Sequence, residues 1–259
     1  VGFRPFVYTL ARRHGLTGWV RNDAQGVAIE VEGAATALFA DQVRRFAPPL
    51  ARVDAVESRP IPCIGDSEFR IEASVDGEAA TRIGPDTAPC DACLAEMCDP
   101  ADRRWRYPFV NCTQCGPRYT IAAGLPYDRA RTSMAAFALC PDCAREYADP
   151  CDRRFHAQPV ACPACGPSLS MPIEAAVAAL AAGAIVALKG AGGYQLACDA
   201  TSEGAVARLR RRKPRDGKPF AVMVASVEAA RRIAHVDAEA AVLLRSPQRP
   251  IVLLPRRED

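Results

Sequence analysis

Apolar and polar residues alternate with two different periods over the first 75 positions of the chain. Apolar residues at helical spacing predict helices over residues 3–14 and 34–46. We expect four strands, over residues 17–22, 27–32, 51–61 and 68–74, and the strand over 27–32 alternates apolar and charged residues. This order of elements predicts a small α+β sandwich with two helices on one face of a sheet that lacks its first strand.

The pattern changes after residue 171, where alanine-rich helices alternate with short apolar stretches. We expect helices over residues 173–182, 202–212, 227–234 and 238–244. We expect strands over residues 184–188, before Cys198, over 220–224 and over 251–254. Helices that alternate with strands predict an α/β domain, incomplete at its C-terminus. Because the chain starts without methionine and stops soon after an apolar stretch, we expect it to be a fragment.

Eight cysteines between these two regions form four C-x-x-C pairs. They are Cys90 and Cys93, Cys112 and Cys115, Cys140 and Cys143, and Cys162 and Cys165. The second half of the segment repeats the first at an offset of 50 residues, and the run from Asp102 to Arg104 returns as Asp152 to Arg154. Two C-x-x-C turns complete a tetrahedral site of four thiolates, which suits Zn²⁺. The spacing predicts two structural zinc ions per chain.

Other interpretations of these cysteines fit the sequence less well. Redox pairs of the thioredoxin type would lie near a βαβ pattern, and disulfide frameworks belong to small secreted domains. An iron–sulfur cluster also uses four thiolates, but the two-plus-two spacing is typical of a zinc ribbon. We expect ligand pairing within each repeat, with a crossed arrangement of the pairs as the alternative. Given four thiolates per site, we expect His156 to be a surface residue rather than a ligand.

Arginines and aromatic residues lie between the paired cysteines, including Arg103, Arg104, Trp105 and Phe155. Such interleaving can bind nucleic acid. In a small zinc module it more often packs around the metal and forms a solvated face, and we favour that interpretation.

Composition limits the class of protein. The chain has 259 residues, 49% of them hydrophobic, and a formal net charge of +3, which by itself indicates neither a nucleic acid nor a membrane as partner. The sequence has no apolar run of membrane-spanning length. Thiolates that must stay reduced indicate the cytoplasm. We expect three regions, residues 1–75, 76–171 and 172–259.

The N-terminal region resembles the acylphosphatase family in two short motifs. These are Val1-Gly2-Phe3-Arg4, similar to the end of that family's glycine-rich loop, and the strand Gly18-Trp19-Val20-Arg21-Asn22. The resemblance implies an acylphosphatase-like (ferredoxin-like) sandwich. It also implies two catalytic residues, Arg4, which would grip a phosphate, and Asn22, which would orient the attacking water.

A basic run follows the helix predicted over residues 202–212. It can complement the helix dipole, form a nucleic-acid patch, or clamp a triphosphate. The stretch Lys213-Pro214-Arg215-Asp216-Gly217-Lys218 resembles the K-x-R plus proline motif of YrdC-like, ATP-using domains. The segments 194–200 and 246–250 resemble two further parts of that family. The resemblance implies that Lys213, Arg215 and Lys218 bind the nucleotide.

The order of these three regions resembles the HypF family of hydrogenase maturation carbamoyltransferases. The resemblance implies that carbamoyl phosphate is hydrolysed in the first region and that the carbamate is joined to ATP as carbamoyl adenylate in the last. It further implies transfer of the carbamoyl group to the C-terminal cysteine of a HypE-type maturation protein, on the way to the cyanide ligands of [NiFe]-hydrogenase. Two other functions stay open at this point, a nucleic-acid-binding zinc module and a tRNA threonylcarbamoyl-type enzyme.

Overall fold

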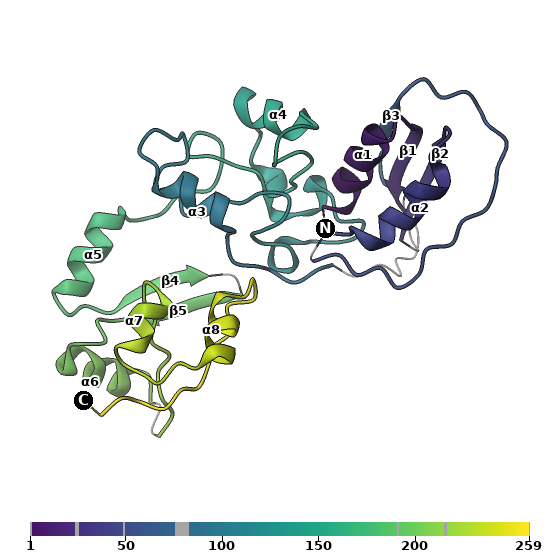
Figure 1. Ribbon diagram of the computed structural model, residues 1–259. Helices are drawn as coiled ribbons and strands as arrows, with labels where there is room; N and C mark the ends of the chain where they lie inside the picture. The colour runs from purple at the N-terminus through teal and green to yellow at the C-terminus, as the bar shows by residue number, and fades with distance from the viewer. Residues whose placement is uncertain are drawn as a thin grey trace. The chain divides into compact units, whose positions relative to one another are not determined.

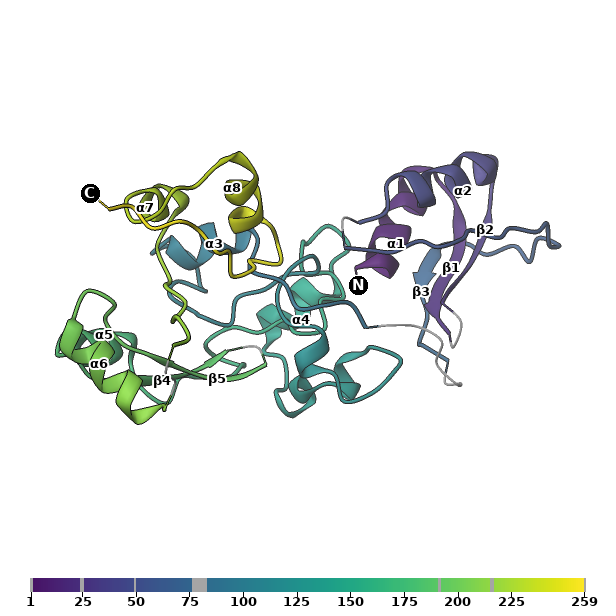
Figure 2. The same cartoon turned by 90° about the horizontal axis from the view of Figure 1, so that it is seen from below.

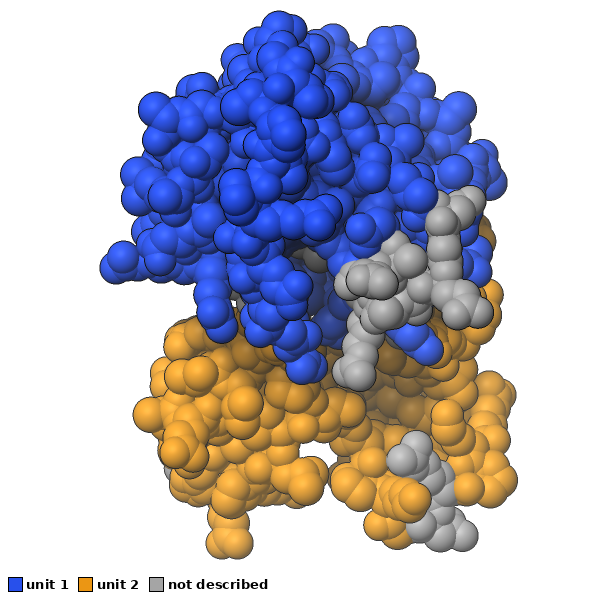
Figure 3. Space-filling model, turned by 90° about the vertical axis from the view of Figure 1, so that its right-hand side faces the viewer, with its two compact units in different colours: residues 1–167 blue, residues 168–259 orange. Residues whose placement is uncertain are grey.

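The computed structural model describes residues 2–23, 26–48, 50–75, 83–190, 192–214 and 217–258. The chain divides into two compact units, residues 1–167 and residues 168–259, coloured separately in Figure 3. Among the described residues, no helix combines the length and the apolar character that crossing a membrane requires.

The first unit begins with the predicted α+β sandwich. Its elements are α1 (Phe3–Arg13), β1 (Thr17–Asn22), β2 (Val27–Glu32), α2 (Thr36–Arg45) and β3 (Phe69–Ile71). The sheet order is β2-β1-β3, with β1 antiparallel to β2 and parallel to β3. Both helices lie against the sheet (Figures 1 and 2). The prediction of two helices on one sheet is confirmed, and β1 and β2 have the predicted bounds.

The core of this sandwich is built from the apolar stripes of both helices. Val7, Leu10 and Ala11 of α1 are at most 4% exposed. They pack in one cluster with Phe39 of α2 and Val20 of β1. Burying a large apolar side chain stabilises a fold by roughly 1.5–3 kcal/mol, so this cluster holds α1 firmly against the sheet. The start of α1 is thereby held in place.

The strand predicted over residues 51–61 is wrong. The described residues between α2 and β3 have no helix or strand, and they run away from the sheet as a wide loop (Figure 1). Pro60 and Pro62 lack the N–H that a strand ladder needs, and the apolar side chains of Val56 and Ile61 are exposed. Alternating apolar and polar residues form a strand only where the apolar side chains are buried, and here they are not. The strand predicted over residues 68–74 is confirmed only over its central part, β3.

The cysteine-rich segment has short helices joined by turns. They are α3 (Asp91–Cys98), η1 (Tyr119–Ile121), η2 (Arg129–Arg131), η3 (Ser133–Ala136) and α4 (Pro141–Ala148). The helices α3 and α4 occupy equivalent places in the two repeats, each starting directly after the first cysteine of a C-x-x-C pair. The apolar clusters around them include the cysteines themselves. The cysteine sites are therefore the centres of this segment.

In its described residues, the second unit has a two-stranded sheet and four helices. Its elements are α5 (Ile173–Ala181), β4 (Val186–Gly190), β5 (Gly193–Ala197), α6 (Glu203–Arg212), α7 (Val227–Arg231) and α8 (Ala238–Arg245). The strands β4 and β5 are antiparallel. The strands predicted over residues 220–224 and 251–254 are wrong in this structure. Both stretches are unpaired and expose large side chains, Met223 at 92% and Ile251 at 79%. A strand forms only where another strand takes its backbone hydrogen bonds.

Candidate metal centres and anion site

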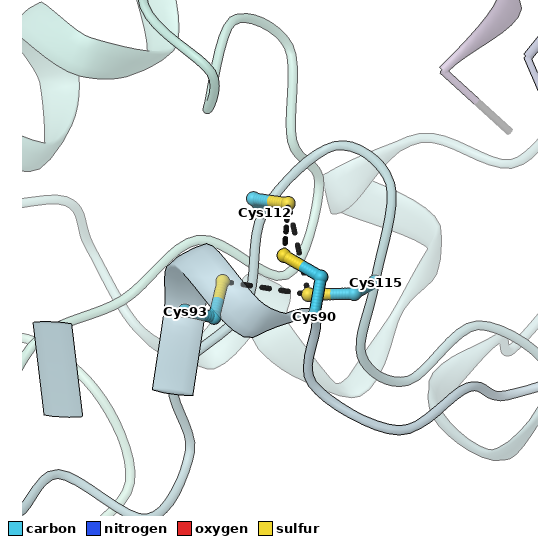
Figure 4. Close-up of side chains that lie close together, drawn as sticks. All are labelled: Cys90, Cys93, Cys112 and Cys115. Carbon is cyan, nitrogen blue, oxygen red and sulfur yellow. Dashed lines mark hydrogen bonds between the residues drawn. The ribbon is translucent and has the colours of Figure 1, made fainter. Parts of the chain in front are cut away.

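The first cysteine cluster gathers the four sulfurs of one repeat. The Sγ atom of Cys112 lies 3.8 Å from the Sγ atom of Cys90 and 3.6 Å from that of Cys115, and the Sγ atoms of Cys115 and Cys93 are 3.4 Å apart. Figure 4 shows these sulfurs turned toward one another from the start of α3 and from the turn that holds the second pair. The separations are far longer than a disulfide bond of about 2.05 Å, so the cysteines are free thiols.

The second cluster repeats this arrangement with Cys140, Cys143, Cys162 and Cys165. The Sγ atom of Cys162 lies 3.7 Å from that of Cys140 and 3.7 Å from that of Cys165. In each cluster the four sulfurs lie within 4.8 Å of one another. The ligand sets are therefore formed within each repeat, and the crossed alternative is wrong.

The separations fit a tetrahedral zinc ion. Four sulfurs at about 2.3 Å from one Zn²⁺ lie about 3.8 Å from each other, close to the distances in both clusters. Cys93 and Cys143 are fully buried and lie in the first turns of α3 and α4. The helix dipole favours negative charge there, which stabilises the thiolates that zinc requires. With all four positions filled by protein, such a site holds structure and leaves no position for a substrate.

Each cluster receives an arginine from the opposite repeat. Arg153 donates from Nη2 to the Sγ of Cys93 at 3.0 Å, and Arg103 donates from Nη2 to the Sγ of Cys143 at 3.1 Å. A zinc ion with four thiolates carries a net charge of −2, so a guanidinium beside the sulfurs offsets part of that charge. The repeats therefore exchange arginines while each keeps its own cysteines.

Two ion pairs, each with a buried arginine, complete the exchange. Arg154 pairs with Glu96 of α3, while Arg104 pairs with Glu146 of α4 at 2.5 Å. Arg104 and Arg154 are at most 3% exposed. Burial raises the pKa of the Glu96 carboxyl, but hydrogen bonds from Arg153 and Arg154 outweigh it and hold the pKa at about 2. Burial and the arginines act on Glu146 in the same way, and its pKa is also lowered.

These contacts decide between the two interpretations of the basic and aromatic residues. The Nε of Arg104 donates to the carbonyl of Ala161 at 2.9 Å, and the Nε of Arg154 donates to that of Asn111 at 3.1 Å. Arginines used in this way cannot contact a phosphate backbone. Packing around the metal sites is the interpretation that the structure supports, and the nucleic-acid alternative loses its main sequence feature. In the sequence, the arginines that contact the opposite repeat are marked by the repeated Asp-Arg-Arg run.

The predicted catalytic residues Arg4 and Asn22 line one cavity of about 1600 Å³. Arg4 lies in the first turn of α1 and is 8% exposed, and Asn22 is the last residue of β1. The Nη2 of Arg4 donates to Oδ1 of Asp128 at 2.5 Å, and its Nη1 donates to Oγ of Ser74 at 3.2 Å. Gly2, with φ 71°, begins α1 in the left-handed conformation that favours glycine.

His156 is half-buried and lines the same cavity, so its prediction as a surface residue is wrong. Its ring lies 4.6 Å from that of Phe155 and 5.0 Å from that of Tyr147. Burial lowers the pKa of the imidazole to about 4, with a further lowering from the charge of Arg4. At neutral pH this histidine is therefore uncharged. No sequence motif marks Asp128, which follows Pro126 and Tyr127 in the segment between the repeats.

The predicted nucleotide-binding residues lie in the second unit. Lys213 and Lys218 are exposed, and Arg215 lies outside the described residues. Lys213 caps the C-terminus of α6, where a cation complements the helix dipole. The guanidinium of Arg210 lies 4.6 Å from the ring centre of Phe220 and donates to the carbonyl of Lys218 at 3.2 Å. The binding role of the three cations stays a prediction.

Three family models match the chain in order. A model described as acylphosphatase matches residues 1–71, and one described as HypF finger matches residues 90–122 and 139–171. A model named Sua5_yciO_yrdC, described as telomere recombination, matches residues 178–259. Together they match the acylphosphatase-like, zinc-finger and YrdC-like fold classes that the sequence predicts.

Known proteins match over the whole chain. It is 59% identical to a carbamoyltransferase HypF of Rhizobium leguminosarum bv. viciae, over 99% of this chain and 34% of that protein. It is 48% identical to a carbamoyltransferase HypF of Synechocystis, over 100% of this chain and 36% of the relative. A crystal structure of full-length HypF in the phosphate- and nucleotide-bound form superposes with a TM-score of 0.95 at 46% identity, covering 100% of this chain and 36% of that one. The chain spans about a third of the length of these relatives.

Proposed function

Because this chain belongs to the HypF family, we propose that it supplies the carbamoyl phosphate hydrolysis and ATP-binding parts of a cytoplasmic carbamoyltransferase in hydrogenase maturation. The regions 1–75, 76–171 and 172–259 would be the hydrolytic, zinc-binding and ATP-using parts. The observation that carries the proposal is the arrangement at Arg4, a buried guanidinium that faces a cavity shared with Asn22.

The hydrolytic step follows from the chemistry of these two side chains. The guanidinium of Arg4 and the backbone N–H groups at the start of α1 bind the phosphate oxygens of carbamoyl phosphate. The side-chain amide of Asn22 orients a water for attack on phosphorus. The new P–O bond to water forms as the bond to the carbamoyl oxygen breaks, and phosphate and carbamate leave. Positioning and charge stabilisation are the main contributions a protein makes to such a reaction.

The carbamate is then consumed in the second unit. Its oxygen attacks the α-phosphorus of ATP and pyrophosphate leaves, which gives carbamoyl adenylate. Lys213, Arg215 and Lys218 would offset the charge of the triphosphate. A solved relative is described as phosphate- and nucleotide-bound, which supports both binding functions. The carbamoyl group would pass to the C-terminal cysteine of a HypE-type maturation protein, on the way to cyanide ligands.

Two zinc ions per chain complete the proposal, one in each four-cysteine cluster, with a structural role. The acylphosphatase and HypF finger matches leave no support for a tRNA threonylcarbamoyl-type enzyme, because that alternative has no use for either region.

The test is phosphate release from carbamoyl phosphate, and pyrophosphate release from ATP with and without carbamoyl phosphate, by the protein as it is encoded. We expect Arg4→Ala to abolish both the hydrolysis and the carbamoyl-phosphate-dependent release of pyrophosphate. Replacing Lys213 and Arg215 should abolish only the second reaction. Hydrolysis that survives Arg4→Ala would remove Arg4 from the site.

A further inference from the structure

The guanidinium of Arg4 is held by residues that are distant in the sequence. Ser74 follows β3, and Asp128 lies in the segment between the two cysteine repeats. The hydroxyl of Ser74 accepts from Arg4 Nη1 and donates to Oδ2 of Asp128 at 2.6 Å, while Oδ1 of Asp128 accepts from Arg4 Nη2. The three side chains form a closed ring of hydrogen bonds, which allows the guanidinium plane only one orientation.

This ring leaves the arginine able to bind a ligand. An arginine has five N–H donors, and the ring uses two of them, one on each terminal nitrogen of Arg4. Three donors are left for an anion in the adjoining cavity. A carboxylate beside a guanidinium that is only 8% exposed also offsets the cost of burying its charge. Asp128 therefore meets the requirements for orienting Arg4 while leaving donors available.

Asp128 is itself fixed to the second cysteine repeat through the next residue. The backbone N–H of Arg129 donates to Oε1 of Gln158 at 2.7 Å. The guanidinium of Arg129 donates to the carbonyls of Gln158 at 2.6 Å, Val160 at 2.9 Å and Phe137 at 2.8 Å. Val160 is fully buried and lies two residues before Cys162. The position of the Asp128 carboxylate therefore follows the position of the second cysteine turn.

The first cysteine turn approaches the same anion site from another direction. A Cβ atom added to Gly2 would lie 3.0 Å from Cγ2 and 3.2 Å from the carbonyl oxygen of Thr113, which lies between Cys112 and Cys115. The start of α1 is thus in close contact with one cysteine turn, while Arg4 is connected to the other. Both repeats contribute to the shape of the site.

We propose that Asp128 is a positioning residue for Arg4, and that the cysteine-rich region thereby completes the acylphosphatase-like site. This inference rests on the proposed hydrolysis of carbamoyl phosphate at that site. A carboxylate in this place has one other conceivable effect: it could shield Arg4 and compete with phosphate. The two roles predict opposite results when the charge of Asp128 is removed.

The first experiment measures hydrolysis of carbamoyl phosphate and binding of inorganic phosphate by the encoded protein and its Asp128→Asn variant. Displacement of a catalytic group by about 1 Å costs roughly 100-fold in rate, so we expect kcat/KM to fall by about 10- to 100-fold. The affinity for inorganic phosphate, followed by the fluorescence of Trp19 in the same cavity, should fall as well. Asp66→Asn is the matched control, because Asp66 lies before β3 and pairs with Arg70 of that strand at 2.6 Å.

The second experiment is chemical rescue, which a merely structural role would not produce. In Arg4→Ala, free guanidinium at millimolar concentration can occupy the space left by the side chain, provided that Asp128 holds it. We expect guanidinium to restore part of the hydrolysis in Arg4→Ala and none in the double variant Arg4→Ala with Asp128→Asn. Far-UV circular dichroism and zinc content, unchanged in both variants, would show that they fold.

The outcomes separate this inference from the proposed function. If the wild-type protein neither hydrolyses carbamoyl phosphate nor binds phosphate, the proposed function and the inference both fail. If Arg4→Ala is inactive but Asp128→Asn behaves as the wild type does, only the role of Asp128 is overturned. Tighter phosphate binding by Asp128→Asn, or equal rescue of the single and double variants, would also overturn it.

Discussion

The two cysteine repeats have the same frame and different outer faces. Both place a helix after the first cysteine, both bury an arginine against a glutamate of the other repeat, and both have a left-handed residue at equivalent positions, Arg106 at φ 56° and His156 at φ 51°. The residue before it differs in its surroundings. Trp105 is 47% exposed, whereas Phe155 is 6% exposed. The second repeat therefore has an occupied face at this position, whereas the equivalent side chain of the first repeat is about half exposed.

The occupied face joins the second repeat to the acylphosphatase-like sandwich. The ring of Phe155 lies 5.2 Å from that of Tyr8 on α1, and Tyr8 lies 6.0 Å from Phe69 of β3. Trp105 instead has the guanidinium of Arg106 at 5.5 Å from its ring centre. Duplication thus provides two similar modules, and the aromatic residue at this position packs against α1 in the second of them.

The repeats also secure their second cysteine turns differently. In the first repeat, Arg118 is 1% exposed and donates to the carbonyls of Cys112, Thr113 and Cys115. The second repeat has Ser168 at the equivalent position. There, Arg129 of the connecting segment binds the backbone before Cys162 instead. Arg129 directly follows Asp128 in the chain, and Asp128 pairs with Arg4. The segment that binds the second cysteine turn is therefore also the one that contacts Arg4.

The largest effect should come from removing one metal ligand in each repeat. Cys93→Ser and Cys143→Ser each leave three thiolates, and structural zinc binding contributes about 10–16 kcal/mol in small zinc modules at pH 7. We expect each variant to lose the fold of its own cluster and to bind one zinc instead of two, as measured by native mass spectrometry. Two zinc ions retained in either variant would contradict the ligand assignment.

The exchange of arginines predicts that a substitution in one repeat weakens the zinc site of the other. Arg154→Met removes the buried one of the two arginines that pair with Glu96 and leaves Arg153, at 2.8 Å, as the remaining partner of this carboxylate. We expect faster zinc release from the first cluster in Arg154→Met and from the second in Arg104→Met, followed with a chromogenic chelator. Cobalt substitution and the cysteine variants identify which cluster has lost its metal. Release confined to the mutated repeat would contradict the exchange.

The aromatic difference between the repeats is tested by a matched pair of truncations. Phe155→Ala removes a buried ring between the two parts of the first unit, and such a change costs about 3 kcal/mol or more in the free energy of unfolding. Trp105→Ala, at the equivalent exposed position, should change it by less than about 0.5 kcal/mol. Equilibrium unfolding in urea measures both. Equal losses would show that the two faces are equally used.

Much of this architecture follows from local patterns in the sequence. The apolar stripe of α1, the alternation in β1 and β2, and the C-x-x-C spacing each depend on residues close to one another in the chain, and each was predicted correctly. The stretch 51–61 has similar alternation, and 220–224 and 251–254 are short apolar runs. Among the described residues none of the three has a partner strand, which a local pattern cannot reveal.

The candidate site was predicted only in part, for a related reason. Arg4 and Asn22 could be identified from short motifs, whereas Asp128 is 124 positions from Arg4 and lies in a segment without a motif. The prediction for His156 is wrong because charged groups from outside its repeat, Arg4 of α1 and Asp128, lie close to a ring that already packs on Phe155 and Tyr147. Contacts between modules depend on how the modules pack, and the periodicity of one module carries no information about that.

The smallest expected effect is on the pH dependence of stability, and it distinguishes a substitution at His156 from one at the equivalent residue, Arg106. Burial lowers the pKa of His156 to about 4, below the ordinary value of 6.5, so the unfolded chain takes up a proton that the folded chain does not. This difference contributes no pH dependence above pH 6.5, and it lowers stability as the pH falls from 6.5 toward 4. Between pH 7.5 and 5.5 the expected loss from His156 is about 1 kcal/mol. His156→Gln should flatten this part of the urea-unfolding profile, whereas Arg106→Gln, at the equivalent position, should leave it unchanged. A profile with the same slope in all three proteins would contradict the lowered pKa of His156.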